Sequence, residues 1–529
     1  NLGNTAWAFS ALYLRNEPLI DAIAAASIRT MHQFAATQNL SNLAWAVAPL
    51  SITHDPLLES ISAESIPRIG EFISQQLANT AWAFACLGRF NNPLCDAIAA
   101  PARRIVSCFD PSGASEDILF GVDLRGLGWA YAFAGALSTS LECHLREAHL
   151  KIGCALDVAR QYLGAFDSTE WFDGSVGTFA QNDALACRVD KPCQVESVPR
   201  IVFDQLGLGI IVVFKPPGWE VDDDEKPPVG RRLTGFLQHT YPWSVVMRDG
   251  EHAYGIIHRL DLPSSGLILA GSTFEGYYHI KWQLDTGKIV REYVVLCHGW
   301  VSPSLQEINA PIHHIPDKHA AKKTLPSWQR TSRSTITEMG KPAQTFIRVL
   351  AHLVRGSWRF SLIICRIRTG RRHQIRAHLH HAWHPTVVDG KYTRAQILGA
   401  DQQWCPRNFL HRQRLVFLDG NGREQEVVEE LPTDLRSALR RLAPAMPAAS
   451  VTSTWPSPSS GATSARVLAE WTAEEGYRPR AWADYETLSE SDVAVRGGLP
   501  PHWAGLGWGG PESGRLSPAR DVRVEGFIG

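Results

Sequence analysis

The pattern of apolar and polar positions changes character along the chain. Over residues 1–165, small and apolar residues recur at helical spacing, and four segments centred on Trp7, Trp45, Trp82 and Trp129 resemble one another. The tryptophans are 38, 37 and 47 residues apart, and the first two spacings are typical of helical repeats. We therefore predict an α-helical repeat region over residues 1–165, with the four tryptophans in its shared core.

From residue 200 to residue 432 the pattern is typical of strands. Short apolar runs, such as residues 210–214, 289–296 and 360–364, alternate with turns rich in Gly and Pro. Residues 166–199 show no clear periodicity, and we interpret them as a connector. Residues 433–529 are rich in Pro, Ser and Gly, so we predict a largely disordered tail with one short helix at its start.

The formal net charge of −1 conceals a strongly basic segment. Between Lys318 and Arg414, 19 Lys and Arg residues face only three acids, an excess of +16. Such a segment attracts a phosphate backbone, with an affinity that depends on salt concentration.

Other composition signals exclude several classes of function. The ten cysteines form no Cys-x-x-Cys pair, so a zinc ribbon and a redox motif have no support. No apolar run approaches the roughly 20 residues of a membrane span. We expect no metal, no cofactor and no membrane association.

Candidate chemistry centres on residues 257–270. Apolar flanks predict two strand-like segments around a turn that contains Pro263 and Gly266. Asp261 lies where the first segment meets the turn, a position from which a carboxylate can reach an open cleft. The alternative is an Asp that only caps the turn.

A second candidate stretch runs from Arg368 to Leu379. Five arginines and no acid occur between residues 366 and 376. A Gly turn is predicted to open a helix that carries Arg372 and Arg376 on one face. Arginine side chains bind phosphate in a bidentate manner, and a helix N-terminus favours an anion.

Five segments resemble the RluA-type family of RNA pseudouridine synthases. Residues 258–266 match its His-Arg-Leu-Asp-x-x-Thr-Ser-Gly signature, with Ser264 in place of Thr. Residues 370–378 match Gly-Arg-x-His-Gln-Ile-Arg-x-His. Residues 383–392 match Gly-His-Pro-x-x-Gly-Asp-x-x-Tyr, with Trp383 and Val388 in place of two glycines. The Lys-Pro-x-Gly turn from Lys215 and the strand that holds Tyr293 also fit. One motif alone would be weak evidence, but these follow the family order.

The resemblance implies an α+β fold with a mixed, largely antiparallel sheet, helices on its outer side and RNA in a central cleft. It also implies an enzyme that isomerises uridine in RNA to pseudouridine without a cofactor, after the uridine leaves its stack. Asp261 would be catalytic, Arg376 its ion-pair partner and Tyr293 the platform for the base. The positions expected to bind RNA are Lys215, Arg259, Arg371, Arg372, His373 and Gln374.

The repeat segments resemble the octotricopeptide-type repeats of organellar RNA-binding proteins. This resemblance favours a chloroplast or mitochondrion over the cytoplasm or nucleus. Because the chain begins at Asn1, inside an apparent repeat, we expect a preceding segment. Whether the repeats bind RNA or protein stays open.

Two alternatives to an active synthase stay open from the sequence. One is an inactive RNA-binding protein or RNA chaperone, which the replaced family residues favour. The other is a hydrolase in which Asp261 acts with His258 or His373, and its product would be free uracil. The RNA itself, whether rRNA, tRNA or organellar RNA, is not specified by these motifs.

Overall fold

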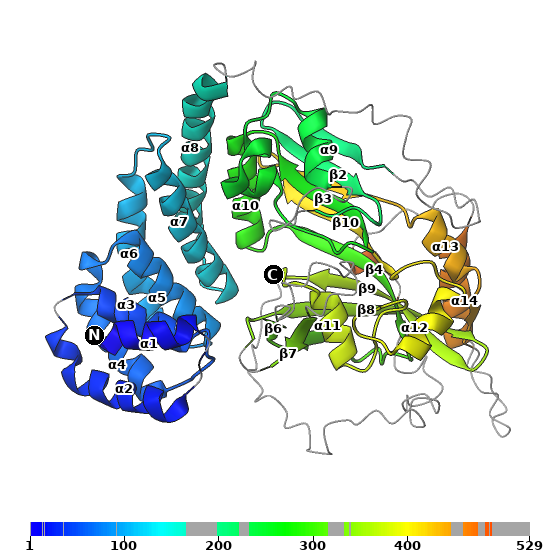
Figure 1. Ribbon diagram of the computed structural model, residues 1–529, viewed down its shortest axis with the longest axis horizontal. Helices are drawn as coiled ribbons and strands as arrows, with labels where there is room; N and C mark the ends of the chain where they lie inside the picture. Colours follow the sequence, from blue (N-terminus) through cyan, green and yellow to red (C-terminus); the bar gives the residue numbers. More distant parts are fainter. Residues whose placement is uncertain are drawn as a thin grey trace, which may run out of the picture.

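The computed structural model describes most of the chain between residues 2 and 488. The described residues are 2–12, 14, 16–34, 36–90, 92–164, 198–221, 232–315, 333–337, 340–445, 459–473, 482–485 and 487–488. A helical array stands beside a unit built on a large sheet (Figure 1). The connector predicted over residues 166–199 lies almost entirely outside the described residues.

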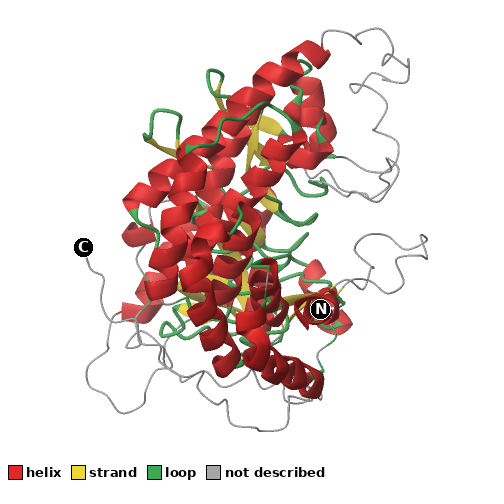
Figure 2. Ribbon diagram, turned by 90° about the vertical axis from the view of Figure 1, so that its left-hand side faces the viewer, coloured by secondary structure: helices red, strands yellow, loops and turns green. Residues whose placement is uncertain are grey.

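The predicted helices are present, and they alternate between two layers. The first layer consists of α1 (Leu2–Ala11), α3 (Gln38–Val47), α5 (Ser74–Cys86) and α7 (Ser115–Phe133). The second consists of α2 (Glu17–Thr30), α4 (Asp55–Arg68), α6 (Asn92–Ser107) and α8 (Thr139–Gly164). Buried alanines such as Ala44, Ala81 and Ala83 let the first-layer helices approach one another closely. Figure 2 shows these helices covering one side of the molecule.

The prediction that the repeat tryptophans lie in the core is wrong for Trp7, whereas Trp82 and Trp129 pack against the core without being fully buried. The side chain of Trp7 is 47% exposed, and Trp45, Trp82 and Trp129 are only partly buried. The centre of the core is filled mainly by alanine and branched aliphatic side chains from the neighbouring helix positions. The Trp7 and Trp45 ring centroids are 6.2 Å apart, and those of Trp45 and Trp82 are 6.4 Å apart. The tryptophans therefore form a row along the helix surfaces.

The second unit is built on a ten-stranded sheet. Its main order is β1-β2-β3-β10-β4-β9-β8-β12, with β11 paired to β10 and β5 paired to β8. The strands are β1 (Arg200–Gln205), β2 (Ile210–Lys215), β3 (Ser265–Gly271), β4 (Val290–His298), β5 (Glu307–Asn309), β8 (Gln344–Arg355), β9 (Trp358–Ile367), β10 (Leu410–Leu418), β11 (Glu424–Val428) and β12 (Ala443–Pro444). Only β3 and β10 pair in parallel among the described strands, so the predicted mixed, largely antiparallel sheet is confirmed.

A small hairpin and short helices flank the sheet. The hairpin pairs β6 (Ile312–Ile315) with β7 (Arg333–Ile336). The helices are α9 (Leu233–Thr240), α10 (Phe274–Asp285), α11 (Gln374–His381), α12 (Ala395–Gln402), α13 (Thr433–Leu439) and α14 (Ser459–Thr472). α10 packs on β3 and β10, whereas α11 packs on β7 and β8.

The helical array is packed firmly onto the sheet unit through α8, α7 and α10. Asp157 of α8 accepts hydrogen bonds of 2.9 Å from the backbone N–H groups of Phe274 and Glu275, and so caps the N-terminus of α10. A Cβ at Gly153 would lie 2.6 Å from the Cα of Glu275, which shows how close the two helices come. Arg125 of α7 pairs with Asp285 at 2.5 Å. One hydrophobic core therefore runs from the repeats into the sheet.

Part of the predicted disordered tail is packed. α14 lies against β8 and α13, and its Trp471 is 2% exposed. The pattern was missed because the apolar residues of this helix are few and are flanked by Ser- and Pro-rich sequence. Among the described residues, no helix has the length and apolar character needed to cross a bilayer.

Candidate active site

Asp261 lies in the turn that leads into β3, and buried cations hold this turn from two sides. The Nζ of Lys215 donates to the carbonyl oxygens of Ser264 at 2.7 Å and Leu262 at 3.4 Å. Arg407 donates to the Oγ of Ser265 at 3.0 Å, and it is itself paired with Asp434 at 2.6 Å. The backbone beside Asp261 is therefore fixed before any RNA arrives.

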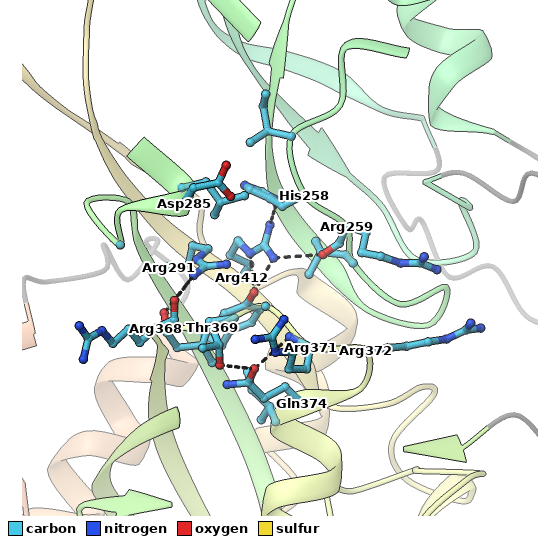
Figure 3. Close-up of a pocket in the computed structure, with 18 of the residues that line it drawn as sticks. His258, Arg259, Asp285, Arg291, Arg368, Thr369, Arg371, Arg372, Gln374 and Arg412 are labelled. Atoms are coloured by element: carbon cyan, nitrogen blue, oxygen red, sulfur yellow. Dashed lines mark hydrogen bonds between the residues drawn. The ribbon is translucent and has the colours of Figure 1, made fainter. Parts of the chain in front are cut away.

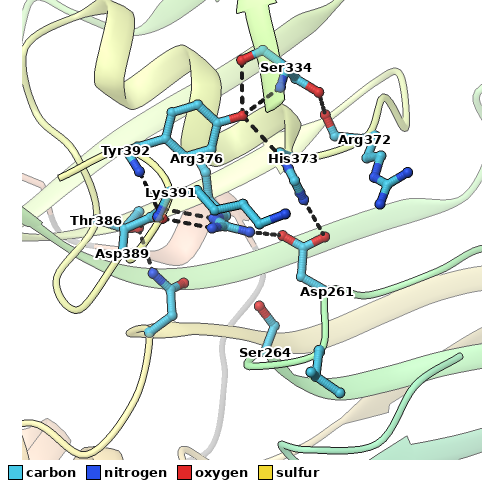
Figure 4. A network of polar contacts seen from close by, with 12 residues as sticks. Asp261, Ser264, Ser334, Arg372, His373, Arg376, Thr386, Asp389, Lys391 and Tyr392 are labelled. Atoms are coloured by element: carbon cyan, nitrogen blue, oxygen red, sulfur yellow. Dashed lines mark hydrogen bonds and ion pairs between the residues drawn. The ribbon is translucent and has the colours of Figure 1, made fainter. Parts of the chain in front are cut away.

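Arg376 of α11 joins Asp261 to a second, fully buried carboxylate. Its Nη1 donates to Asp261 at 2.6 Å, while Nε and Nη2 donate to Asp389 at 2.8 Å and 2.6 Å (Figure 4). Asp389 also accepts from the Thr386 hydroxyl at 3.0 Å and from the Lys391 N–H at 3.0 Å. Since Asp389 fixes the plane of the guanidinium, only Nη1 is left to face Asp261.

The surroundings hold Asp261 in its ionised form. Burial opposes the charge, but the positive charges of protonated His373 and of Arg376 outweigh it and keep the pKa of Asp261 well below its usual range. Burial lowers the pKa of His373 to about 3, so this imidazole is neutral at pH 7. Arg376 is therefore the group that keeps Asp261 charged under ordinary conditions. The side chain of Asp261 is 17% exposed, and its other carboxylate oxygen lies 3.9 Å from His373.

The turn before α11 differs from the predicted helix start. α11 begins at Gln374, with His373 in the left-handed region at φ 54° as its N-cap. Arg372 consequently lies outside the helix, and the predicted shared face with Arg376 is wrong for this residue. The side chain of Gln374 accepts from the Thr369 hydroxyl at 2.8 Å and from the Arg371 N–H at 3.0 Å. Gln374 is buried and lines the cavity, and these two hydrogen bonds show that its side chain also holds the turn.

Lys215 is a second correction among the predicted RNA-binding residues. Its side chain is fully buried and donates only to backbone carbonyls. Burial, reinforced by Arg407, lowers the pKa of Lys215 to about 7. Lys215 therefore supports the Asp261 turn, and a phosphate cannot reach it.

Asp261 opens into a cavity of about 540 Å³. Its lining is strongly basic (Figure 3). The cationic lining residues are Arg259, Lys281, Arg291, Arg368, Arg371, Arg372, Arg376 and Arg412. Arg259, Arg368 and Arg372 are exposed, whereas Arg371 is partly buried. The helical array contributes Trp129 and Phe133 to the same wall.

Tyr293 of β4 lines the cavity but is 3% exposed. Its hydroxyl accepts from the Nε of Arg412 at 2.8 Å, and the guanidinium lies 4.9 Å from its ring centroid. Arg412 also contacts the His258 ring at 2.6 Å and donates to the Arg259 carbonyl at 3.2 Å. The pair therefore joins β4 and β10 to the strand segment that leads to Asp261.

The two residues that replace family glycines keep a glycine-like backbone. Trp383 has φ 67° and Val388 has φ 56°, both in the left-handed region. Asp401 stabilises the second position by accepting from the Val388 N–H at 3.0 Å, and it also contacts His298 at 2.9 Å. The substitutions thus leave the course of the chain around Asp389 intact.

Sequence reasoning missed Asp389 and Arg407 as parts of the site. Asp389 is one of only three acids within the basic segment, and an isolated acid among so many cations is a signal for a buried pair. Two arginines of that segment, Arg366 and Arg414, pair with buried Glu292 instead of lining the cavity. No group of three or more metal-ligating side chains occurs in the part of the chain that the structure describes.

Comparison with known proteins agrees with this geometry. Residues 209–381 match the RNA pseudouridylate synthase family. Ribosomal large subunit pseudouridine synthase D of Vibrio vulnificus is 33% identical over 244 residues, which cover 44% of this chain and 68% of that protein. The enzyme of the same name from Nitrosomonas europaea is 29% identical over 258 residues, covering 48% and 68%.

A third relative is an uncharacterized RNA pseudouridine synthase of Bacillus subtilis. It is 31% identical over 236 residues, which cover 44% of this chain and 70% of that protein. The fold and these matches define an isomerase that acts on RNA. Within that class, the chain belongs to the RluA-type RNA pseudouridine synthase family, and it is an RNA pseudouridine synthase.

Proposed function

We propose that Asp261 is the catalytic carboxylate, and that it acts on a uridine turned out of its RNA into the basic cavity. The observation that carries this proposal is the 2.6 Å ion pair between Arg376 and Asp261 at the cavity wall. In the reaction the bond between the uracil nitrogen and the sugar breaks, the base turns, and a ring carbon bonds to the same sugar carbon. The hydrogen on that ring carbon leaves as a proton, and the freed nitrogen gains one. No electrons are gained or lost overall, so an ionised carboxylate and fixed cations meet the needs of the site.

Arg376 and Tyr293 have supporting roles in this proposal. Arg376 orients the carboxylate and keeps it ionised. Tyr293 supplies an aromatic wall for the base, and its contacts with Arg412 hold the ring in place. His373 lies on the other side of Asp261 and bounds the space into which the uridine turns.

Asp261→Asn tests the assignment because it keeps the shape of the side chain and removes its charge. The assay follows tritium release from RNA labelled at the uracil carbon that becomes bonded to the sugar. The wild type should release tritium and form pseudouridine, whereas the variant should do neither. Free uracil as the wild-type product would instead support the hydrolase alternative.

The RNA backbone is proposed to contact Arg259, Arg371 and Arg372 at the cavity mouth. All three line the cavity. Arg259 and Arg372 are exposed, whereas Arg371 is partly buried and its Nε donates to the Pro342 carbonyl at 3.0 Å. Each phosphate contact makes RNA affinity fall with salt, by a slope of roughly 0.7 per contact for single strands. Replacing either Arg259 or Arg372 with Gln should remove one phosphate contact, and so lower the salt slope by roughly 0.7. An unchanged slope in both variants would contradict their role.

Two relatives are named for the large ribosomal subunit, which favours a ribosomal RNA as the substrate. We further propose an organelle as the compartment, because the repeat segments resemble organellar RNA-binding repeats. Mapping pseudouridines in organellar and cytoplasmic RNA, with and without the gene, tests both. Loss of a pseudouridine confined to cytoplasmic RNA would contradict the proposed compartment.

A further inference from the structure

Two parallel rows of side chains follow the first layer of the helical array. One row contains Trp7, Trp45 and Trp82, and the other contains Asn4, Asn42 and Asn79 at the position three residues earlier in each helix. We call these six residues the aromatic strip. Residues three apart lie on one face of a helix, so the two rows run side by side from α1 through α3 to α5. The Nδ2 of Asn42 donates to the Oδ1 of Asn4 at 3.0 Å, which links the amide row across two helices.

Trp7 and Trp45 lie outside the core, whereas Trp82 is partly buried and packs against it. Trp7 is 47% exposed, and the neighbouring apolar positions, such as Leu43 and Leu77, already fill the interior. Large aromatic side chains left at a protein surface in a regular row indicate a contact surface. None of the six residues carries a charge, so the strip offers rings and amides without repelling an anion.

The strip leads to the cavity that holds Asp261. α5 packs on α7, and α7 carries Trp129 at the matching repeat position, followed one turn later by Phe133. Their rings stack with centroids 4.8 Å apart, and both line the cavity. Arg368 of the cavity lies 5.6 Å from the Phe133 ring and donates to the Ala132 carbonyl at 2.6 Å.

Contacts between the helical array and the sheet unit fix the position of the strip relative to the cavity. Asp157 caps α10, Arg125 pairs with Asp285, and Lys288 pairs with Glu142 at 2.6 Å. An added Cβ at Gly128 would lie 2.9 Å from the Trp282 ring, which shows that α7 and α10 are closely packed at this point. The distance from the strip to Asp261 is therefore fixed by packing.

We propose that the aromatic strip binds the single-stranded RNA that flanks the target uridine, by stacking bases on Trp7, Trp45 and Trp82 and contacting them through the asparagine amides. The proposal rests on the activity of the synthase and adds how the enzyme holds RNA outside the cavity. Single-stranded RNA is favoured over a protein partner because the strip continues through α5 to α7, which lines the cavity proposed to receive RNA. Aromatic stacking of this kind tolerates any base, while amides can bond to exposed base edges.

The test compares two fluorescein-labelled oligouridylates, of five and of twenty nucleotides, by fluorescence anisotropy. The wild type should bind the longer oligonucleotide more tightly than the shorter one. The measured quantity is the ratio of the dissociation constants of the short and the long probe. In the double variant Trp7→Ala/Trp45→Ala this ratio should fall by at least tenfold, since each lost base stack weakens binding roughly 5- to 150-fold. Affinity for the five-nucleotide probe should stay unchanged. Annealing the longer probe to oligoadenylate should remove the advantage in the wild type, because paired bases cannot stack on the strip.

Trp243→Ala is the matched control, since Trp243 is 57% exposed and belongs to neither the strip nor the cavity lining. It should bind both probes as the wild type does. Thermal unfolding of the double variant should match that of the wild type to within a few degrees, which separates lost stacking from lost folding.

Photocross-linking supplies a readout that does not depend on substitution. A twenty-nucleotide probe that carries 5-iodouridine should cross-link to peptides from α1, α3 or α5. Cross-links confined to the sheet unit, or a double variant that binds both probes as the wild type does, would overturn the proposal and leave the strip as a protein-docking or packing surface. Failure of the Asp261 assignment would appear only in the tritium assay, so the two failures are distinguishable.

Discussion

The Asp261 network and the aromatic strip hold their functional groups in opposite ways. Around Asp261 the supporting charges are buried and have fixed partners, from Lys215 behind the turn to Asp389 behind Arg376. Along the strip, Trp7 and its neighbours keep part of their surface open to solvent. The first arrangement suits a reaction that needs one geometry, and the second suits binding that must tolerate many sequences. Substitutions should therefore affect catalysis at the network and only affinity at the strip.

Asp389→Asn should have the largest combined effect on reaction rate and folding stability. It removes the charge that fixes the Arg376 guanidinium, and breaking a buried ion pair costs about 3–5 kcal/mol of folding stability. A carboxylate displaced by about 1 Å loses roughly 100-fold in rate, so the single-turnover rate should fall at least that far. The measurements are tritium release and thermal unfolding.

Glu426→Gln is the control for that variant. Its side chain is 48% exposed and pairs with Arg414, and neither residue lines the cavity, so the expected cost is about 0–1 kcal/mol. Equal losses of rate and stability in Asp389→Asn and Glu426→Gln would show that the charge beside Arg376 matters no more than a surface charge.

Trp282→Ala tests the packing between the helical array and the sheet unit. Trp282 is 1% exposed, and it packs against Gly128 and His149 where the array meets α10. Its removal should cost about 3–5 kcal/mol of folding stability, measured by chemical denaturation. Trp7→Ala, at the exposed end of the strip, should cost less than about 1 kcal/mol. Deleting residues 1–165 would expose the same face of α10, so point variants are the cleaner tool.

Acid should destabilise the fold while Asp261 stays ionised. Burial lowers the pKa of His149, His352 and His378 to about 4, and that of His373 and His411 to about 3. Below pH 6.5 these histidines are protonated in the unfolded chain but stay neutral in the folded protein. The free energy of unfolding therefore falls as pH falls, by about 1.4 kcal/mol per pH unit for each histidine. Calorimetry should show a steep fall in Tm as the pH is lowered below 6. A Tm that is constant from pH 7 to pH 5 would show that these rings are not buried.

Lys215→Met should have the smallest of these effects. The variant keeps the apolar stem and removes the donor to the Ser264 and Leu262 carbonyls. Because the turn loosens without any change at the RNA surface, kcat should fall by about tenfold, which is about 1.4 kcal/mol, with KM unchanged. A raised KM with an unchanged kcat would restore the original prediction that Lys215 binds RNA.

The catalytic unit could be predicted from sequence because its motifs concentrate unusual residues in short segments. Asp261 and Arg376 are 115 residues apart, yet their motifs indicated a pair that the structure places at 2.6 Å. The burial of Lys215 and Gln374 could not be predicted, since the same polar side chains serve RNA contact and backbone support. The exposed strip was missed although a signal was present. An Asn three residues before each of the first three repeat tryptophans places a polar group on the same helix face, which indicates a surface row and not a core.

The most direct test of the central claim is single-turnover kinetics of Asp261→Asn alongside its RNA affinity. Affinity should stay within a few-fold of the wild type, because the basic cavity and the strip are untouched. The rate of pseudouridine formation should fall by more than about 1000-fold, since the isosteric amide carries no negative charge for the reacting nucleoside. A variant that binds RNA normally and forms pseudouridine within tenfold of the wild-type rate would contradict the account.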